Sequence, residues 1–301
     1  MTSEKFKGHL AAISLNLIFG LNISISKSFL GALWMSSMSF TIARMFFGFA
    51  VFWILSFFMV REKTAGRDLL FIMLGGFFGL VVTLVSFAVG IRFTSPVVWS
   101  LIAALGPIFV LLLAALFLKD PISLKKAIGV IIGISGAILV VLKGRSGGVF
   151  SSSILGVCIS LLCVTSYAAY IVITRKISAK YTPVTTMKWM FLVAFVLLSP
   201  FGIPELPSQR VFSSEVTLLP ILQLGFSLIF ASAVGYCLMP VALKRLKATT
   251  VSMYANLQPL VASTAAIISG QDAFTWDKPL ALFLVITGVY IVTQSHSQSG
   301  N

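Results

Sequence analysis

The chain has 301 residues, of which 58% are hydrophobic and 10% are charged, and its mean hydropathy is +1.04. Soluble domains carry roughly 25% charged residues, so this composition excludes a soluble globule and indicates apolar surface in contact with a lipid bilayer. The net charge of +14 raises the alternative of nucleic-acid binding. The basic residues, however, lie in short loops between apolar stretches, and no nucleic-acid-binding motif accompanies them. We therefore expect no nucleic-acid partner.

Ten apolar stretches follow one another along the chain, each near the length of about 20 residues that a helix needs to cross the hydrocarbon core. The loops between them carry Gly, Pro, Ser or charged residues. We predict an all-α membrane protein with ten transmembrane helices, at 8–26, 37–59, 69–90, 96–118, 124–142, 154–174, 184–202, 217–242, 248–270 and 279–295.

The distribution of basic residues predicts the orientation of these spans. Fourteen Lys and Arg residues fall on the side of the N-terminus and six on the opposite side. Because positive charge accumulates on the cytoplasmic side, we expect a multi-pass protein of the cell inner membrane with both termini in the cytoplasm. The three cysteines lie inside apolar segments without metal-ligand spacing, so we expect no metal, cofactor or disulfide.

The two halves of the chain are related by an internal repeat. A shift of 152 residues aligns spans 4 and 5 with spans 9 and 10 in nine matching pairs, which include Pro107 with Pro259 and Asp120 with Asp272. A shift of 148 aligns span 1 with span 6. We predict repeats over 1–146 and 147–301. Because each holds five spans, the second enters the membrane inverted, as in secondary transporters that bind substrate between their halves.

The order of these motifs resembles the EamA family of the drug/metabolite transporter superfamily. The resemblance covers nearly the whole chain, although Phe and Asp stand where the family commonly has Trp and Glu. It implies a ten-helix permease around a central cavity that exports amino acids or related metabolites. The residues that carry it are Phe19-Gly20, Arg44, Pro107 to Asp120 and Gly129, Gly133 and Gly136, with Tyr167-Ala168, Ala242-Leu243-Lys244, Pro259, Asp272 and Gly288 in the second copy.

Arg44 is the clearest charged residue inside a predicted span. Charged groups at membrane depth usually face a cavity or a partner helix, and a guanidinium binds carboxylates in bidentate fashion. We interpret Arg44 as a candidate site for a substrate carboxylate. The alternative is a structural arginine that extends to the interface or pairs with backbone carbonyls.

Spans 1 and 6 each carry polar and aromatic residues on one helical face. Asn16, Phe19 and Asn22 follow at intervals of three in span 1, and Tyr167 and Tyr170 share a face of span 6. Because both repeats carry polar and aromatic residues on the corresponding helical face, we expect this face to line a substrate cavity. Hydrogen bonds between helices are the structural alternative.

A third candidate set surrounds the prolines of spans 4 and 9. Trp99 in span 4, and Tyr254 and Gln258 in span 9, are further cavity candidates. Pro107 and Pro259 each remove a backbone donor and permit a bend, so these matching positions are candidate gate hinges. A fixed bend without gating is equally compatible with the sequence.

Acidic residues and histidines are missing from the interior of the predicted spans. All eight acidic residues and both histidines lie at span ends or in loops. Asp120 and Asp272, which end their spans, are expected to pair with loop residues or cap helices. Proton-coupled carriers usually need a titratable group in the pathway, so we predict facilitated diffusion or exchange.

The sequence therefore predicts a secondary transporter, most plainly an amino-acid exporter that works by alternating access. A broad-specificity efflux permease for amphiphilic compounds remains an alternative. A non-transport membrane protein, such as an intramembrane enzyme or an assembly factor, is disfavoured, because no catalytic carboxylates or histidines converge inside the spans. We expect a small-molecule substrate and no catalytic residues. The oligomeric state stays open, and a monomer is compatible with the sequence.

Overall fold

The computed structural model of the chain describes residues 3–118, 153–246 and 248–272, with scattered positions between 128 and 135 and between 274 and 291. All regular structure in these residues is helical. Eight helical stretches are long and apolar enough to cross a membrane, and they correspond to eight of the ten predicted spans. The predicted span 124–142 falls largely outside the described residues, the predicted span 279–295 is described only at scattered positions, and the predicted boundary at residue 146 is not described. The predicted all-α membrane fold is confirmed.

Some spans are continuous helices and others are interrupted. In the first half the helices are α1 (Ser3–Gly31), α2 (Ser37–Phe57), α3 (Gly66–Gly76), the π-helix η1 (Phe77–Val82), α4 (Thr83–Gly90), α5 (Pro96–Ala103) and α6 (Gly106–Leu118). In the second half they are α8 (Ile154–Ser178), α9 (Pro183–Gly202), the 3₁₀-helices η3 (Leu206–Ser208) and η4 (Arg210–Phe212), α10 (Leu218–Phe226), the π-helix η5 (Ser227–Val234), α11 (Gly235–Arg245), α12 (Ala248–Met253), the 3₁₀-helix η6 (Tyr254–Asn256) and α13 (Leu257–Ile268).

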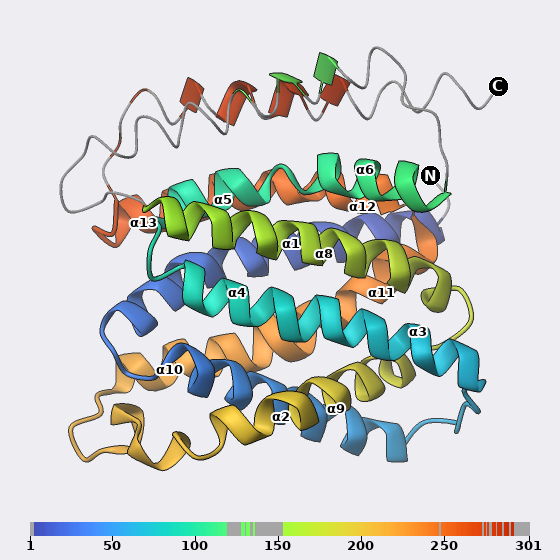
Figure 1. Cartoon of the computed structure of the whole chain (residues 1–301), viewed down its shortest axis with the longest axis horizontal. Coiled ribbons are helices and arrows are strands. Elements are labelled where there is room, and N and C mark those ends of the chain that lie inside the picture. The colour runs from blue at the N-terminus through green and yellow to red at the C-terminus, as the bar shows by residue number, and fades with distance from the viewer. Residues whose placement is uncertain are drawn as a thin grey trace.

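The interruptions recur at matching places in the two halves. Spans 3 and 8 each contain a π-helical segment near their middle, η1 and η5. Spans 4 and 9 are each broken into two helices, between α5 and α6 and at η6. Figure 1 shows that corresponding spans run in opposite directions: α3 and α4 run from right to left, and α10 and α11 from left to right. The fold therefore consists of two inverted helical repeats.

Each break lies directly before a proline. Pro107 is the second residue of α6 and Pro259 the third of α13. A proline in the first turn of a helix costs no hydrogen bond, because the first N–H groups have no partner inside the helix. The sequence predicts bends at the two prolines, and the structure has complete helix interruptions that the prolines follow. Their proposed role as moving hinges stays a prediction.

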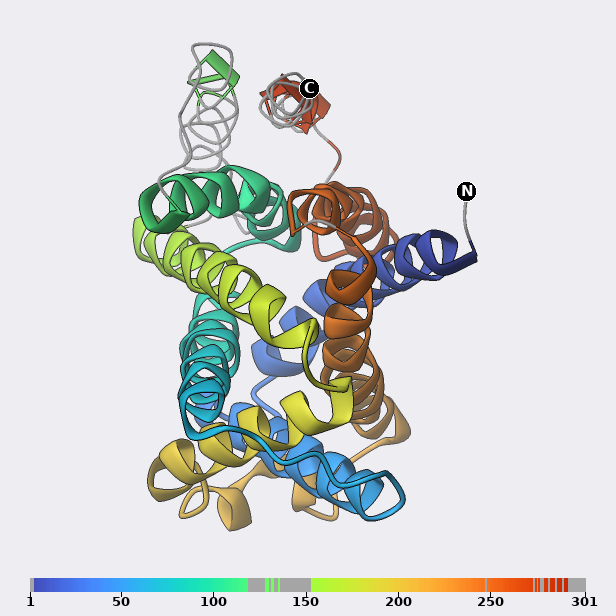
Figure 2. The ribbon, with the colours of Figure 1, turned by 90° about the vertical axis from the view of Figure 1, so that its right-hand side faces the viewer.

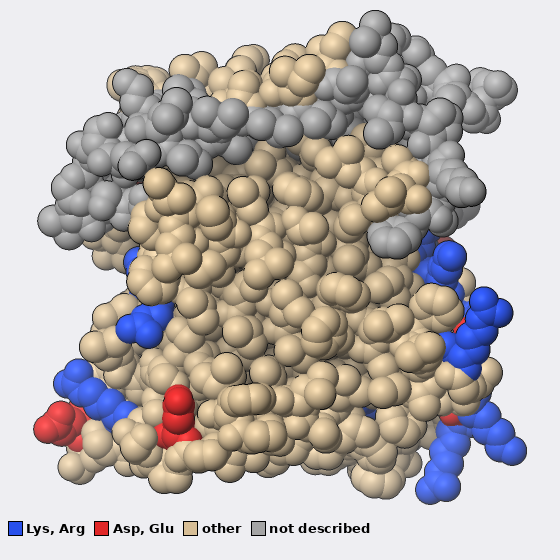
Figure 3. Space-filling view, viewed as in Figure 1, with Lys and Arg blue, Asp and Glu red and all other residues tan. Residues whose placement is uncertain are grey.

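The helices surround the centre of the molecule, as the end-on view shows (Figure 2). α2 and α9 pack closely on one side, where Gly48 lies directly against the ring of Phe191, and Gly202 against Ile42. Small residues permit this close approach in membrane helices. On the outside, the visible described surface has a broad central band without charged residues, and Lys, Arg, Asp and Glu are gathered at its two ends (Figure 3). This distribution fits a bilayer around the band.

Two carboxylates in loops link the repeats at the N-termini of α2 and α9. Glu62 accepts hydrogen bonds from the backbone N–H and the hydroxyl of Thr182, each 3.0 Å long, and Thr182 caps α9. Glu205 accepts a 2.6 Å hydrogen bond from the hydroxyl of Ser36, which caps α2. Burial by itself raises the pKa of Glu62, but hydrogen bonds from Thr185 and Thr182 outweigh it and hold the pKa below the ordinary value.

Candidate functional site

A cavity lies between α1, α8 and the broken spans 4 and 9, and the centres of water-sized molecules fit within about 100 Å³ of it. Its wall takes residues from both repeats, which agrees with the site position expected for inverted-repeat carriers. The residues that line it are Asn16, Phe19, Asn22, Ile23, Arg44, Thr83, Leu84, Phe87, Trp99, Ala103, Gly106, Val110, Cys163, Val164, Tyr167, Ala168, Ile171, Tyr236, Met239, Val251, Ser252, Ala255 and Gln258.

Arg44 is the charged residue of the described cavity wall. Its side chain is 2% exposed, and its Nε donates a 2.8 Å hydrogen bond to the hydroxyl of Ser232 in η5. The rings of Phe40 and Phe87 lie 5.6 and 6.0 Å from its Cζ, at distances where a cation is attracted to a ring face. Its two terminal nitrogens form no hydrogen bond or ion pair with any residue that the structure describes. The Nε contact thus fixes the guanidinium and leaves its forked end available.

A chain of hydrogen bonds extends from Arg44 to α1. The hydroxyl of Ser232 donates to the carbonyl of Ser227 at 2.9 Å, and the hydroxyl of Ser227 donates to Oδ1 of Asn22 at 2.9 Å. The Ser232 bond spans five residues and satisfies a carbonyl of the π-helix. The π-helix therefore places the partner of Arg44 behind the cavity wall and joins it through Ser227 to Asn22 of the first span.

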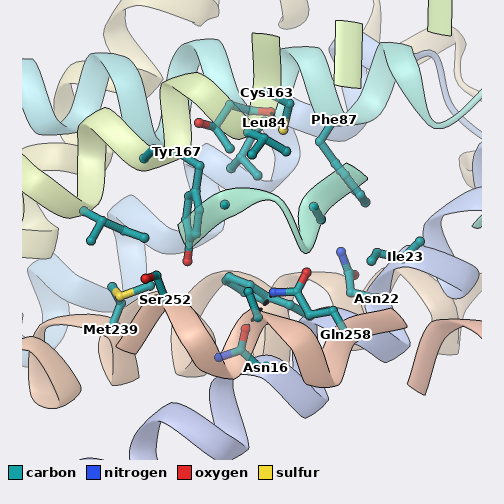
Figure 4. A pocket seen from close by; sticks show the side chains of 18 of the residues that line it. Asn16, Asn22, Ile23, Leu84, Phe87, Cys163, Tyr167, Met239, Ser252 and Gln258 are labelled. Atoms are coloured by element: carbon teal, nitrogen blue, oxygen red, sulfur yellow. Dashed lines mark hydrogen bonds between the residues drawn. The ribbon is translucent and has the colours of Figure 1, made fainter. Parts of the chain in front are cut away.

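A second polar group lies where α1 meets α13. Gln258 Nε2 donates a 2.7 Å hydrogen bond to Oδ1 of Asn16, and Nδ2 of Asn16 donates to the carbonyl of Ala12 at 2.8 Å. Figure 4 shows the amides of Asn16 and Gln258 side by side, with Tyr167 pointing from the opposite wall toward Ser252. Gln258 is the second residue of α13, so the break of span 9 brings this amide to the cavity.

Aromatic rings cover much of the remaining wall. Phe19 contacts Tyr167 and Tyr236, with ring centroids 6.3 and 5.7 Å apart. Phe87 meets Trp99 edge-on at 5.3 Å. Offset and edge-on arrangements are the favourable ones for aromatic pairs. The wall therefore offers flat apolar surfaces between its two polar groups.

The structure brings most of the candidate residues of the sequence together. Arg44, Asn16, Phe19, Asn22, Trp99, Tyr167 and Gln258 all line the cavity. Two candidates do not. Tyr170 is fully buried and packs against Gly79 of η1, and Tyr254 accepts or donates a 2.6 Å hydrogen bond with Nδ1 of His9. Among the acidic span ends, Asp272 is buried just beyond α13, whereas Asp120 lies outside the described residues.

Sequence reasoning missed three polar residues of the wall, Tyr236, Thr83 and Ser252. The hydroxyl of Tyr236 donates to the carbonyl of Gly79 at 3.1 Å, and that of Thr83 to the carbonyl of Phe78 at 2.7 Å. These bonds depend on η1, and no sequence pattern marks a π-helix. For Ser252 a signal was within reach, because the shift of 152 residues pairs it with Ser100 of span 4.

Comparison with known proteins agrees with this architecture. A solved protein structure that is 16% identical superimposes over 100% of both chains with a TM-score of 0.66, which shows the fold. An uncharacterized transporter of Archaeoglobus fulgidus is 28% identical over 273 residues, which are 90% of this chain and 92% of that protein. The uncharacterized transporter YyaM of Bacillus subtilis is 29% identical over 217 residues, 71% of this chain and 68% of that protein. The sequence model of the EamA-like transporter family matches residues 6–142 and 154–294, and the chain belongs to this family of membrane transporters.

Proposed function

We propose that the protein is a secondary transporter that exports small carboxylate-bearing metabolites, the class that includes the amino acids expected from the sequence. The observation that supports this substrate class is Arg44, a buried cation in the cavity wall with its terminal nitrogens unused by the described residues. A buried charge without a counter-ion is costly, and a bound carboxylate supplies two parallel hydrogen bonds as well as the opposite charge.

The inverted repeats support alternating access as the mechanism. Corresponding spans carry the same interruptions in opposite orientation, so the two repeats are able to exchange conformations and open the cavity to one side or the other. The broken spans 4 and 9 both reach the cavity, at Gly106 and Gln258. In this proposal, movement at the breaks changes which side of the membrane the cavity faces.

Facilitated diffusion or exchange fits the cavity better than proton coupling. The described cavity wall contains no Asp, Glu or His, and a proton-coupled carrier needs a group there that gains and loses a proton. The orientation follows from the basic residues: both termini lie in the cytoplasm, and the protein sits in the inner membrane. A substrate gradient then sets the direction of transport.

Counterflow in proteoliposomes tests the proposal. Purified protein is reconstituted, and liposomes loaded with an unlabelled metabolite panel are assayed for saturable uptake of the labelled compound. Arg44→Gln is expected to lower kcat/KM for a carboxylate-bearing substrate by about 10²-fold, since hydrogen bonds to charged groups contribute about 1.5–3 kcal/mol. Arg175→Gln, at an exposed position of α8, is the matched control and is expected to transport normally.

Three results would contradict parts of the proposal. Normal transport of the carboxylate by Arg44→Gln shows that Arg44 does not bind it. Saturable flux of unrelated amphiphiles without a carboxylate favours a broad efflux permease. A flux that depends on the proton gradient at constant membrane potential shows that the transport is coupled to protons.

A further inference from the structure

The cavity has an unbalanced charge. Arg44 contributes a positive charge, and the described wall holds no acidic residue to match it. The two predicted spans that the structure describes only at scattered positions, 124–142 and 279–295, contain no Asp, Glu or His in their sequences. Of the acidic residues near the helix ends, Asp272 is buried but does not line the cavity. Neither the described wall nor the sequences of these two spans therefore supply a carboxylate to pair with a substrate ammonium.

The neutral groups of the wall are poorly placed to replace a counter-ion. Three side-chain amides line the cavity, and two of their oxygens already accept hydrogen bonds: Oδ1 of Asn16 from Gln258, and Oδ1 of Asn22 from Ser227. The hydroxyl of Tyr236 donates to a backbone carbonyl. A neutral oxygen satisfies a single N–H but leaves the charge itself uncompensated.

An amino acid brings an ammonium group as well as a carboxylate into this cavity. Its carboxylate gains the contact with Arg44, but its ammonium loses water, meets no opposite charge, and is repelled by the guanidinium at close range. A carboxylate with an uncharged body makes the same contact without this cost. Its body meets the rings of Phe19, Phe87 and Trp99, which suit flat or branched apolar groups.

We infer that the cavity selects monocarboxylates whose remaining part is uncharged, and that it discriminates against the zwitterionic amino acid with the same side chain. The inference rests on the carboxylate contact proposed for Arg44 and narrows the substrate class within it. The substrates inferred here are counterparts of amino acids without an ammonium group, such as deaminated or N-acylated acids, and not the amino acids themselves.

Equilibrium binding to the purified full-length protein in detergent is the test, because apolar carboxylic acids cross liposome membranes unaided. Isothermal titration at pH 7.5 compares matched ligands: 3-phenylpropionate, phenylalanine and phenethylamine, and in a second series 4-methylpentanoate and leucine. We expect each carboxylate to bind at least tenfold more tightly than its amino acid, and phenethylamine not to bind. Arg44→Gln is expected to abolish binding of the carboxylates.

An added negative charge supplies the complementary test. Asn16→Asp keeps the size of the side chain and an oxygen that accepts from Gln258, and it places a carboxylate in the wall. This variant is expected to bind phenylalanine at least tenfold more tightly than the parent protein and to lose affinity for 3-phenylpropionate. Thermal unfolding of each variant verifies that it is folded before the titration.

The outcomes separate this inference from the proposed function. If phenylalanine binds to the parent protein as tightly as 3-phenylpropionate, and Arg44→Gln weakens both, the inference is wrong while the carboxylate contact stands. If no carboxylate binds, or if Arg44→Gln binds them normally, the proposed contact fails and the inference fails with it. If Asn16→Asp shifts the preference toward phenylalanine as stated, the charge argument is supported.

Discussion

Gly76, the last residue of α3, allows this helix to approach α9 closely. A Cβ atom built on Gly76 would lie 2.9 Å from the Cα and the carbonyl oxygen of Met190. These are backbone atoms and have no rotamer by which to move aside. Ordinary contact begins at 3.4 Å, so Gly76→Ala requires the two helices to separate by about half an ångström, and overpacking of this kind costs about 1–3 kcal/mol.

Gly225 provides a matched control in the other repeat. It lies in α10 just before η5, as Gly76 lies just before η1, and a Cβ atom there meets no atom within 4 Å. Both substitutions gain the helix propensity of alanine, about 1 kcal/mol, so this gain cancels when the two variants are compared. Gly76→Ala is therefore expected to be about 1–3 kcal/mol less stable than Gly225→Ala.

Unfolding of the purified variants in detergent, followed by intrinsic fluorescence against temperature and against added SDS, measures this difference. Each kcal/mol corresponds to a shift in Tm of about 2–4 °C for a chain of this size class. Equal stability of the two variants would refute the close packing of α3 on α9. A loss of stability in Gly225→Ala would show that the local backbone, and not the contact with Met190, is responsible.

Two further substitutions and one labelling experiment have defined outcomes. Hydrogen bonds from Thr185 and Thr182 hold the pKa of Glu62 below its ordinary value despite burial. The contact therefore stabilises the fold fully above about pH 4.5 and less as the pH falls through the lowered pKa. Glu62→Gln is expected to lower Tm at pH 7 and to reduce the decrease in Tm between about pH 5 and about pH 3. Tyr254→Phe removes the hydrogen bond to His9 and is expected to cost about 0.5–1.5 kcal/mol of stability, with KM unchanged because Tyr254 does not line the cavity. Cys163 does line it, so bound substrate is expected to slow its modification by a maleimide.

Each of these predictions has its own control. Glu215→Gln alters an exposed carboxylate whose ion pair with Arg210 is 3.8 Å long, and it is expected to leave the pH profile of Tm unchanged. An altered KM in Tyr254→Phe would place that residue at the substrate. Cys158 is exposed on the outer surface, and its modification rate is expected to be independent of substrate. Equal protection of Cys158 and Cys163 would argue against a cavity at Cys163.

The fold was accessible from the sequence because its two determinants are patterns of residue type. Spans follow from runs of apolar residues, and the inverted repeats from matched pairs such as Pro107 and Pro259. The face of span 1 that carries Asn16 and Asn22 also follows from helical spacing, and both residues line the cavity. Regular spacing of residue types along the sequence was sufficient for these predictions.

The remainder depends on irregular backbone and on contacts between distant segments. Tyr170 shares a helical face with Tyr167, yet the close approach of Gly79 directs its ring into the core instead. Tyr254 lies in the 3₁₀ segment that breaks span 9, so a spacing of four to Gln258 no longer places the two on one face. Its pairing with His9 joins residues 245 positions apart, which no local pattern predicts.

The π-helical segments give spans 3 and 8 a means of rotation. A π-helix accommodates one extra residue within the hydrogen-bonded helix, and one residue corresponds to a turn of about 100° around the helix axis. If the extra residue moves along the span, the part beyond it rotates while its backbone hydrogen bonds are exchanged and not lost. The side chains beyond η1 and η5 that face the cavity are Thr83, Leu84 and Phe87 in one repeat and Tyr236 and Met239 in the other. The side chains that line the cavity therefore depend on how spans 3 and 8 are rotated about their axes. A transporter with two such π-helical segments is able to change its cavity wall without bending a span.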